Sequence, residues 1–270
     1  MDRQNYLPDS NRIGVLASTV LLALVMTRLI QVPGISLELQ LPGFLVSLPL
    51  NLATIMSLLT AGLTATGMDW LLRSHPALHG KTTVQWWLLP TLTTVVISVL
   101  LSLLPDGTAW WVGFALSGVF LILVFLAEYV SVDQSAPYYP TAIAGLTAIS
   151  YTLFFILAIA LRFGDVRLYI ILPTLFLASG LASLRILNLR LGGSWEYAWS
   201  LGIAYVCAQI AAGLHYWPLS PIQFGLMLIG PLYGVVNYAI LLGEDLPSRR
   251  AALMPAIATS LCWGLAILIR

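Results

Sequence analysis

One short run, residues 69–81, is the densest polar stretch of an otherwise apolar sequence and holds two of its three histidines. Its ionisable members include Asp69, Arg73, His75 and His79. Long apolar segments flank the run, so it is predicted to form a loop at one face of a membrane. With polar residues from other spans, these side chains could form the site of an enzyme that acts on a lipid or isoprenoid substrate. No metal site is predicted, because Pro76 separates the two histidines and prevents them from sharing one continuous helical face.

Other ionisable residues lie near the ends of the predicted membrane spans, where a charge is costly and therefore a functional candidate. With the polar run they define a predicted cytoplasmic-face cluster: Asp69, Arg73, His75, Glu128, Arg185 and Glu196. Glu128 and Arg185 could pair, or either could bind an anionic headgroup or phosphate. The favoured interpretation is structural, with Arg185 extending to the interface and Glu128 capping the bundle through a salt bridge.

The composition requires the bilayer to be the solvent for most of the chain. Of 270 residues, 59% are hydrophobic and only 9% charged, and the mean hydropathy is +0.92. Soluble domains carry about 25% charged residues. Because backbone groups in lipid must be satisfied internally, runs of about 20 apolar residues without alternation predict an all-α bundle of transmembrane helices. The net charge of +1, with no basic block, gives no support for nucleic-acid binding. No cofactor is evident.

Nine spans are predicted, forming one integral membrane domain over residues 1–270 of a cell-membrane protein. Their ranges are 13–31, 46–70, 84–104, 108–130, 139–162, 168–190, 196–215, 220–242 and 250–269. With the N-terminus inside, eight basic residues lie at the cytoplasmic face: Arg3, Arg12, Arg73, Lys81, Arg185, Arg190, Arg249 and Arg250. Four lie at the opposite face: Arg28, Arg162, Arg167 and Arg270. Eight against four predicts a cytoplasmic N-terminus.

Residues 35–41 differ from the rest because apolar and polar side chains alternate along them. This period of two predicts an extended, half-buried strand, and Pro-Gly pairs on both sides predict turns. Without a second strand in view, the segment is expected to lie along the membrane surface, or to pair with another membrane protein or a second copy of the chain.

Two further patterns concern the spans themselves. Short self-matches at spacings of 83, 89 and 81 residues suggest that 84–162 repeats in 168–243, inverted as in many transporters. A stripe of small polar residues marks the second span, and a polar residue of the eighth span joins it as a candidate intramembrane site: Asn51, Thr54, Ser57 and Asn237. Close helix packing is the favoured interpretation of the stripe, and a polar cavity is the alternative.

The chain resembles the intramembrane prenyltransferase superfamily in its nine predicted spans, its cytoplasmic N-terminus and its polar clusters after the second and sixth spans. Members of that superfamily hold magnesium and a prenyl diphosphate on aspartate-rich motifs at those two places. Here the first place offers only Asp69, and the second offers Asn188, Arg190 and Glu196. The resemblance therefore implies the architecture and not the activity. The run from Asp69 to Pro76 is also similar to uncharacterised bacterial multi-pass membrane families, which implies no function.

Three functions follow as hypotheses. A non-catalytic bundle, serving as a subunit, an assembly scaffold or a binder of lipid or pigment, is favoured because no catalytic constellation stands out. A membrane enzyme would act on a lipid or isoprenoid at the cytoplasmic face through the cluster around Asp69. A transporter would depend on the inverted repeat.

Overall fold

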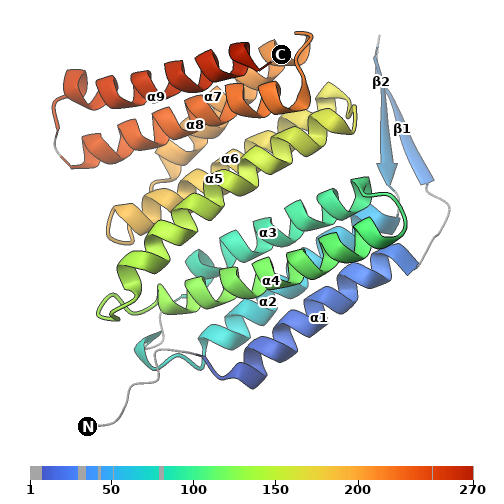
Figure 1. The fold of residues 1–270 in the computed structure, drawn as a ribbon, viewed down its shortest axis with the longest axis vertical. Helices are drawn as coiled ribbons and strands as arrows, with labels where there is room; N and C mark the ends of the chain where they lie inside the picture. The colour runs from blue at the N-terminus through green and yellow to red at the C-terminus, as the bar shows by residue number, and fades with distance from the viewer. Residues whose placement is uncertain are drawn as a thin grey trace. The chain divides into compact units, whose positions relative to one another are not determined.

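The computed structural model describes residues 8–29, 35–41, 44–50, 52–78, 82–244 and 246–269. Within these ranges lie nine helices that are long and apolar enough to cross a membrane, which confirms the predicted all-α transmembrane bundle (Figure 1). The chain divides into two compact units. The first comprises Met1–Leu101 and Pro105–Val132, and the second Ser102–Leu104 and Asp133–Arg270. The single domain, the cytoplasmic N-terminus and the inverted repeat stay predictions.

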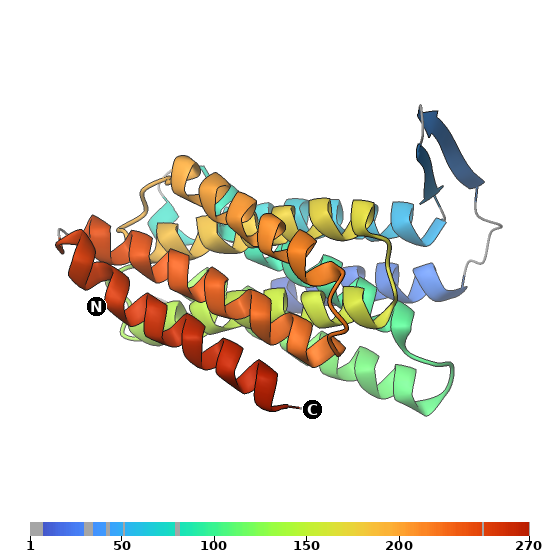
Figure 2. The ribbon, with the colours of Figure 1, turned by 90° about the horizontal axis from the view of Figure 1, so that it is seen from above.

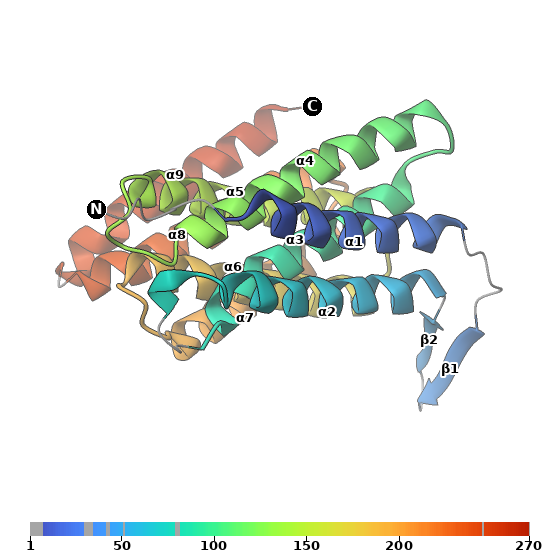
Figure 3. The same ribbon diagram turned by 90° about the horizontal axis from the view of Figure 1, so that it is seen from below.

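The first unit contains four of the helices. They are α1 (Ser10–Leu29), α2 (Leu52–Leu72), α3 (Val84–Leu103, nearly all within this unit) and α4 (Thr108–Val130), with the short 3-10 helix η1 (Pro76–Leu78) between α2 and α3. Figure 3 shows α1 running alongside α2. The two helices approach closely because the side chain of Leu16 fills the space that a Cβ atom at Gly67 would need. Small residues allow this kind of contact in membranes, where packing replaces the hydrophobic drive between helices.

A β-hairpin precedes α2 and corrects one expectation. Strands β1 (Ile35–Leu41) and β2 (Phe44–Leu50) pair antiparallel, from Ile35 opposite Leu50 to Leu41 opposite Phe44. The predicted strand at 35–41 is present and pairs with a second strand of the same chain, while pairing with another protein or a second copy stays a prediction. Residues 46–50 were assigned to the second span, which instead begins at Leu52. Hydrophobicity alone does not separate a strand from the start of a span, and Pro49, which pairs opposite Ser36, lies at a sheet edge, where proline is tolerated.

The second unit contains five helices. They are α5 (Tyr139–Phe163), α6 (Leu168–Arg190), α7 (Tyr197–His215), α8 (Pro221–Gly243) and α9 (Ser248–Leu268). Helix α8 is central, since it packs against each of the other four, and α8 and α9 lie side by side in Figures 1 and 2. Apart from the second span, the predicted spans match their helices to within about three residues at each end, because a long apolar run between polar turns predicts its own limits.

Candidate functional site

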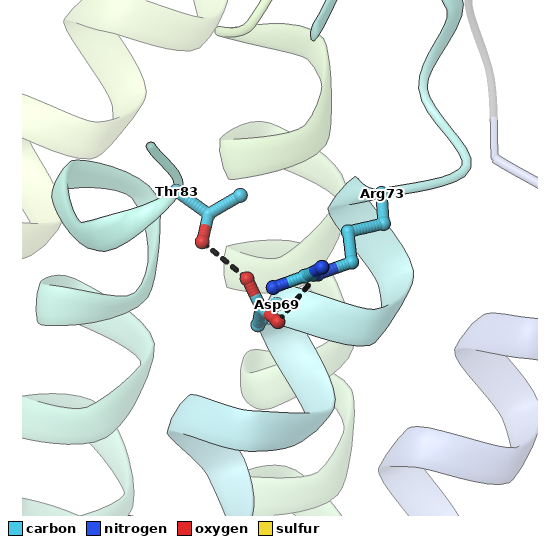
Figure 4. A network of polar contacts seen from close by, with 3 residues as sticks. All are labelled: Asp69, Arg73 and Thr83. Atoms are coloured by element: carbon cyan, nitrogen blue, oxygen red, sulfur yellow. Dashed lines mark hydrogen bonds and ion pairs between the residues drawn. The ribbon is translucent and has the colours of Figure 1, made fainter. Parts of the chain in front are cut away.

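The polar run at the end of α2 forms a closed network around Asp69 (Figure 4). Arg73 Nε donates a hydrogen bond of 2.7 Å to Asp69 Oδ2. Thr83, just before α3, donates from its hydroxyl to the other carboxylate oxygen, Oδ1. Both oxygens are therefore engaged, and the network joins the last turn of α2 to the start of α3. The geometry is that of a structural tie between two helix ends.

His75 and Glu128 are both buried in the first unit. His75 Nδ1 accepts a hydrogen bond of 3.1 Å from the backbone N–H of Ala77, and its ring lies 4.5 Å from the ring of Tyr129. Ser131 donates from its hydroxyl to the backbone carbonyl of Glu128 at 2.8 Å and to Oε2 at 3.3 Å. His75 thus stabilises the turn that follows α2. His79 and Lys81 lie outside the described residues.

In the second unit, Arg185 is only 1% exposed and donates from Nη1 to Asn188 Oδ1 at 3.0 Å. The Asn188 amide donates in turn to the carbonyls of Gly193 at 2.9 Å and Ser194 at 3.3 Å. Gly193 has a φ of 90°, a conformation that glycine adopts without strain. Asn188 therefore fastens the α6–α7 turn. The sequence singled it out only through the prenyltransferase resemblance.

The remaining member of the predicted cluster is Glu196, at the N-cap position of α7. Its backbone carbonyl accepts hydrogen bonds from Ser200, while its side chain makes no cap. The structure thus brings together Asp69 and Arg73 in one network and places Arg185 in another. The Glu128–Arg185 pair, and a single site made of all six residues, stay predictions.

The residues of the predicted polar stripe and its neighbours on α2 differ in their burial and contacts. Thr54 is exposed and Ser57 half-buried on α2, whereas Thr64 is buried and its hydroxyl lies 3.0 Å from that of Thr94 on α3. Asn237 donates to the carbonyl of Tyr233 at 2.8 Å within α8. Asn51 lies outside the described residues. The Thr64–Thr94 contact joins α2 to α3, while the role of the stripe itself stays a prediction.

Arg162, which the sequence counted only as an outer-face charge, holds the segment that follows α7. Its guanidinium donates to the backbone carbonyls of His215 at 3.1 Å, Trp217 at 2.9 Å and Leu219 at 3.4 Å. Carbonyls at a helix C-terminus have no partner within the helix, and an arginine fork can satisfy several at once. This charge is therefore engaged in local structure.

Glycine residues of α8 form a close seam with α9. A Cβ atom at Gly230 would lie 2.9 Å from Cys262 Cβ and 3.4 Å from Thr259 Cα. The Thr259 hydroxyl donates to the Gly230 carbonyl at 3.1 Å. Gly230 and Gly234 are four residues apart, the small-xxx-small spacing of tightly packed membrane helices. That spacing was visible in the sequence, but it does not identify the partner helix.

Trp263 completes the seam through a carbonyl that proline leaves free. Pro231 has no N–H and so cannot donate to the carbonyl of Met227, four residues earlier. The indole N–H of Trp263 donates to this carbonyl at 3.1 Å. An unpaired carbonyl inside a bilayer would cost several kcal/mol. The indole N–H thus holds Trp263 against α8.

An apolar groove with a volume of about 380 Å³ lies beside this seam, between α7, α8 and α9. Its lining comprises Val206 and Ile210 of α7; Pro231, Gly234, Val235 and Tyr238 of α8; and Ala252, Pro255, Ala256, Thr259 and Trp263 of α9. The polar atoms of Thr259 and Trp263 are bonded to the backbone of α8, as described above. The prolines inside α8 and α9, Pro231 and Pro255, both belong to the lining, at positions where proline bends a helix. The sequence did not predict this groove.

Within the described residues, no group of three or more His, Cys, Asp or Glu side chains is arranged to hold a metal ion. A family model described as a protein of unknown function, DUF5656, matches residues 32–269. The chain belongs to the DUF5656 family. The match includes the β-hairpin and α2 to α9 and confirms the expected membership of an uncharacterised family. Searches of curated proteins and of solved structures found no match.

Proposed function

We propose that this protein is a non-catalytic membrane bundle that retains a lipid tail in the groove between α7, α8 and α9. The observation that carries the proposal is the lining of the groove, whose surface is almost wholly apolar. The groove is open to its surroundings, and water would find no polar partners along its lining. Its volume of about 380 Å³ falls within the range of small-molecule sites, roughly 300–1,000 Å³.

The length of the groove supports a hydrocarbon chain as the occupant. Its lining on α9 extends from Ala252 to Trp263, eleven residue steps, or roughly 16 Å at 1.5 Å per residue. This is about half of the ~30 Å hydrocarbon thickness of a bilayer, and so about the depth of one leaflet. A lipid tail gains no hydrophobic free energy on leaving other tails. Its retention would rest on the many close contacts that a fixed, shaped wall provides.

The polar residues favour this function over catalysis. Asp69 has both carboxylate oxygens engaged, Asn188 holds a turn and Arg162 holds three carbonyls. A general acid or base must reach the proton that it transfers, whereas these groups are occupied by local structure. The alternatives of a lipid-acting enzyme and of a transporter stay predictions.

Native mass spectrometry of gently extracted protein tests the proposal. Phenylalanine at Ala256 would fill the centre of the groove, so Ala256→Phe is expected to lose the lipid that the natural protein retains, at the same folded yield. Ser260→Phe is the matched control, because Ser260 is exposed on the same helix and does not line the groove. A natural protein without bound lipid, or equal retention in Ala256→Phe, would contradict the proposal.

A further inference from the structure

The groove-lining face of α9 continues toward its N-terminus into a basic residue. Counting from Arg249, the residues Ala252, Ala256, Thr259 and Trp263 follow at intervals of three, four, three and four. Residues with this spacing lie on one face of a helix. Arg249 therefore extends the stripe of groove-lining residues by about one turn, beyond the point where the apolar lining ends at Ala252.

Arg249 and its neighbour Arg250 are both exposed. Their guanidinium groups form no hydrogen bond or ion pair with any residue that the structure describes. The first turn of α9 contains no acidic residue, and the N-cap residue Pro247 makes no side-chain cap. Helix N-termini carry partial positive charge and favour anions, so the two arginines add to the positive end of the helix, and the acidic pair Glu244 and Asp245 shortly before it offsets part of that charge. An anion at this end would interact favourably with both arginines and with the helix dipole.

We propose that the groove holds a phospholipid with a net negative headgroup, whose phosphate lies against Arg249 and whose acyl chain extends along Ala256 toward Trp263. This proposal rests on the proposed function and adds the class of the lipid. Arg250 contributes to the same positive potential. Arginine suits the role because its guanidinium matches phosphate geometry with two parallel hydrogen bonds.

The dimensions agree with a lipid of one leaflet. Arg249 and Trp263 are fourteen residue steps apart on α9, or roughly 21 Å along the helix. Half of a bilayer, headgroups included, measures about 20–22 Å. With the N-terminus inside, as the positive-inside count predicts, α9 begins at the cytoplasmic face. Anionic lipids give that leaflet its negative surface potential.

A lipid-preference experiment tests the headgroup. Purified protein would be offered phosphatidylglycerol and phosphatidylcholine with identical acyl chains, and native mass spectrometry would count the bound lipid of each kind. The natural protein should prefer phosphatidylglycerol. Arg249→Gln should reduce this preference about fivefold, and the double variant with Arg250→Gln further, since each basic residue near an anionic surface contributes about that factor. Phosphatidylcholine should still bind to both variants.

Controls separate this proposal from the one on which it rests. Arg190→Gln removes an exposed arginine at the end of α6 and should leave the preference unchanged. Millimolar inorganic phosphate should not displace phosphatidylglycerol, because the tail supplies most contacts; displacement would overturn the phospholipid assignment. An unchanged preference in the double variant would overturn the headgroup site while leaving the groove intact. If Ala256→Phe bound each of the two lipids as well as the natural protein does, that result would instead refute the groove as the binding site.

Discussion

The network around Asp69 and the groove beside α9 use opposite kinds of residues. At the end of α2, an arginine and a threonine side chain each donate a hydrogen bond to the carboxylate of Asp69. Along α8 and α9, glycine, alanine and proline leave an apolar space with a basic residue at its end. The charged and hydrogen-bonding side chains described above hold helix ends together. The proposed ligand surface is instead formed mainly by small and apolar residues.

The bilayer gives a physical reason for this division. A helix end near lipid has backbone groups without partners, and an unsatisfied group is more costly there than in water. Polar side chains are therefore needed where helices stop, as Asn188 and Arg162 demonstrate. Between helices, small residues permit close contact, and a proline that bends a helix leaves room beside it.

The largest expected effect comes from breaking the α8–α9 seam. In Gly230→Leu, the new side chain would overlap Cys262 Cβ and crowd the backbone at Thr259. Overpacking of this kind costs about 3 kcal/mol, and the groove should lose its bound lipid. Unfolding in mixed micelles would measure the change in free energy. Gly202→Leu is the control, since nothing lies within 4 Å of a Cβ atom there. Equal stability of the two variants would show that close contact at Gly230 does not hold α8 and α9 together, and so does not shape the groove beside them.

A smaller effect is expected at the α6–α7 turn. Asn188→Leu removes the donor to the carbonyls of Gly193 and Ser194 and leaves Arg185 without this acceptor. Unsatisfied buried groups cost about 1–3 kcal/mol, so the free energy of unfolding should fall by about 2 kcal/mol, with lipid retention unchanged. Asn237→Leu should cost less, because its 2.8 Å bond is to a carbonyl within its own helix. A loss of lipid in folded Asn188→Leu would link the turn to the groove.

Sequence reasoning predicted the parts of this fold that depend on local composition. Long apolar runs located the helices, and alternation located β1. It placed residues 46–50 in a helix because hydrophobicity alone does not separate a strand from the start of a span. It did not find the groove, because the Gly230–Gly234 spacing indicates close packing without naming the neighbouring helix. It grouped Asp69 with Arg73 in a polar cluster but could not see that Thr83 would donate to the same carboxylate.

The smallest effect is expected at Asp69, and this variant tests directly whether lipid retention depends on the polar network or on the groove. In Asp69→Asn, the amide oxygen can still accept from Thr83, while the attraction to Arg73 is lost. The Arg73 side chain is 73% exposed, and exposed ion pairs contribute about 0–1 kcal/mol, so the protein should remain folded and retain lipid. If instead Asp69→Asn abolished lipid retention at normal folded yield, the polar network would be the binding site and the groove a packing defect. Normal retention, together with its loss in Ala256→Phe, would show that binding depends on shape and that the carboxylate serves only the joint between α2 and α3.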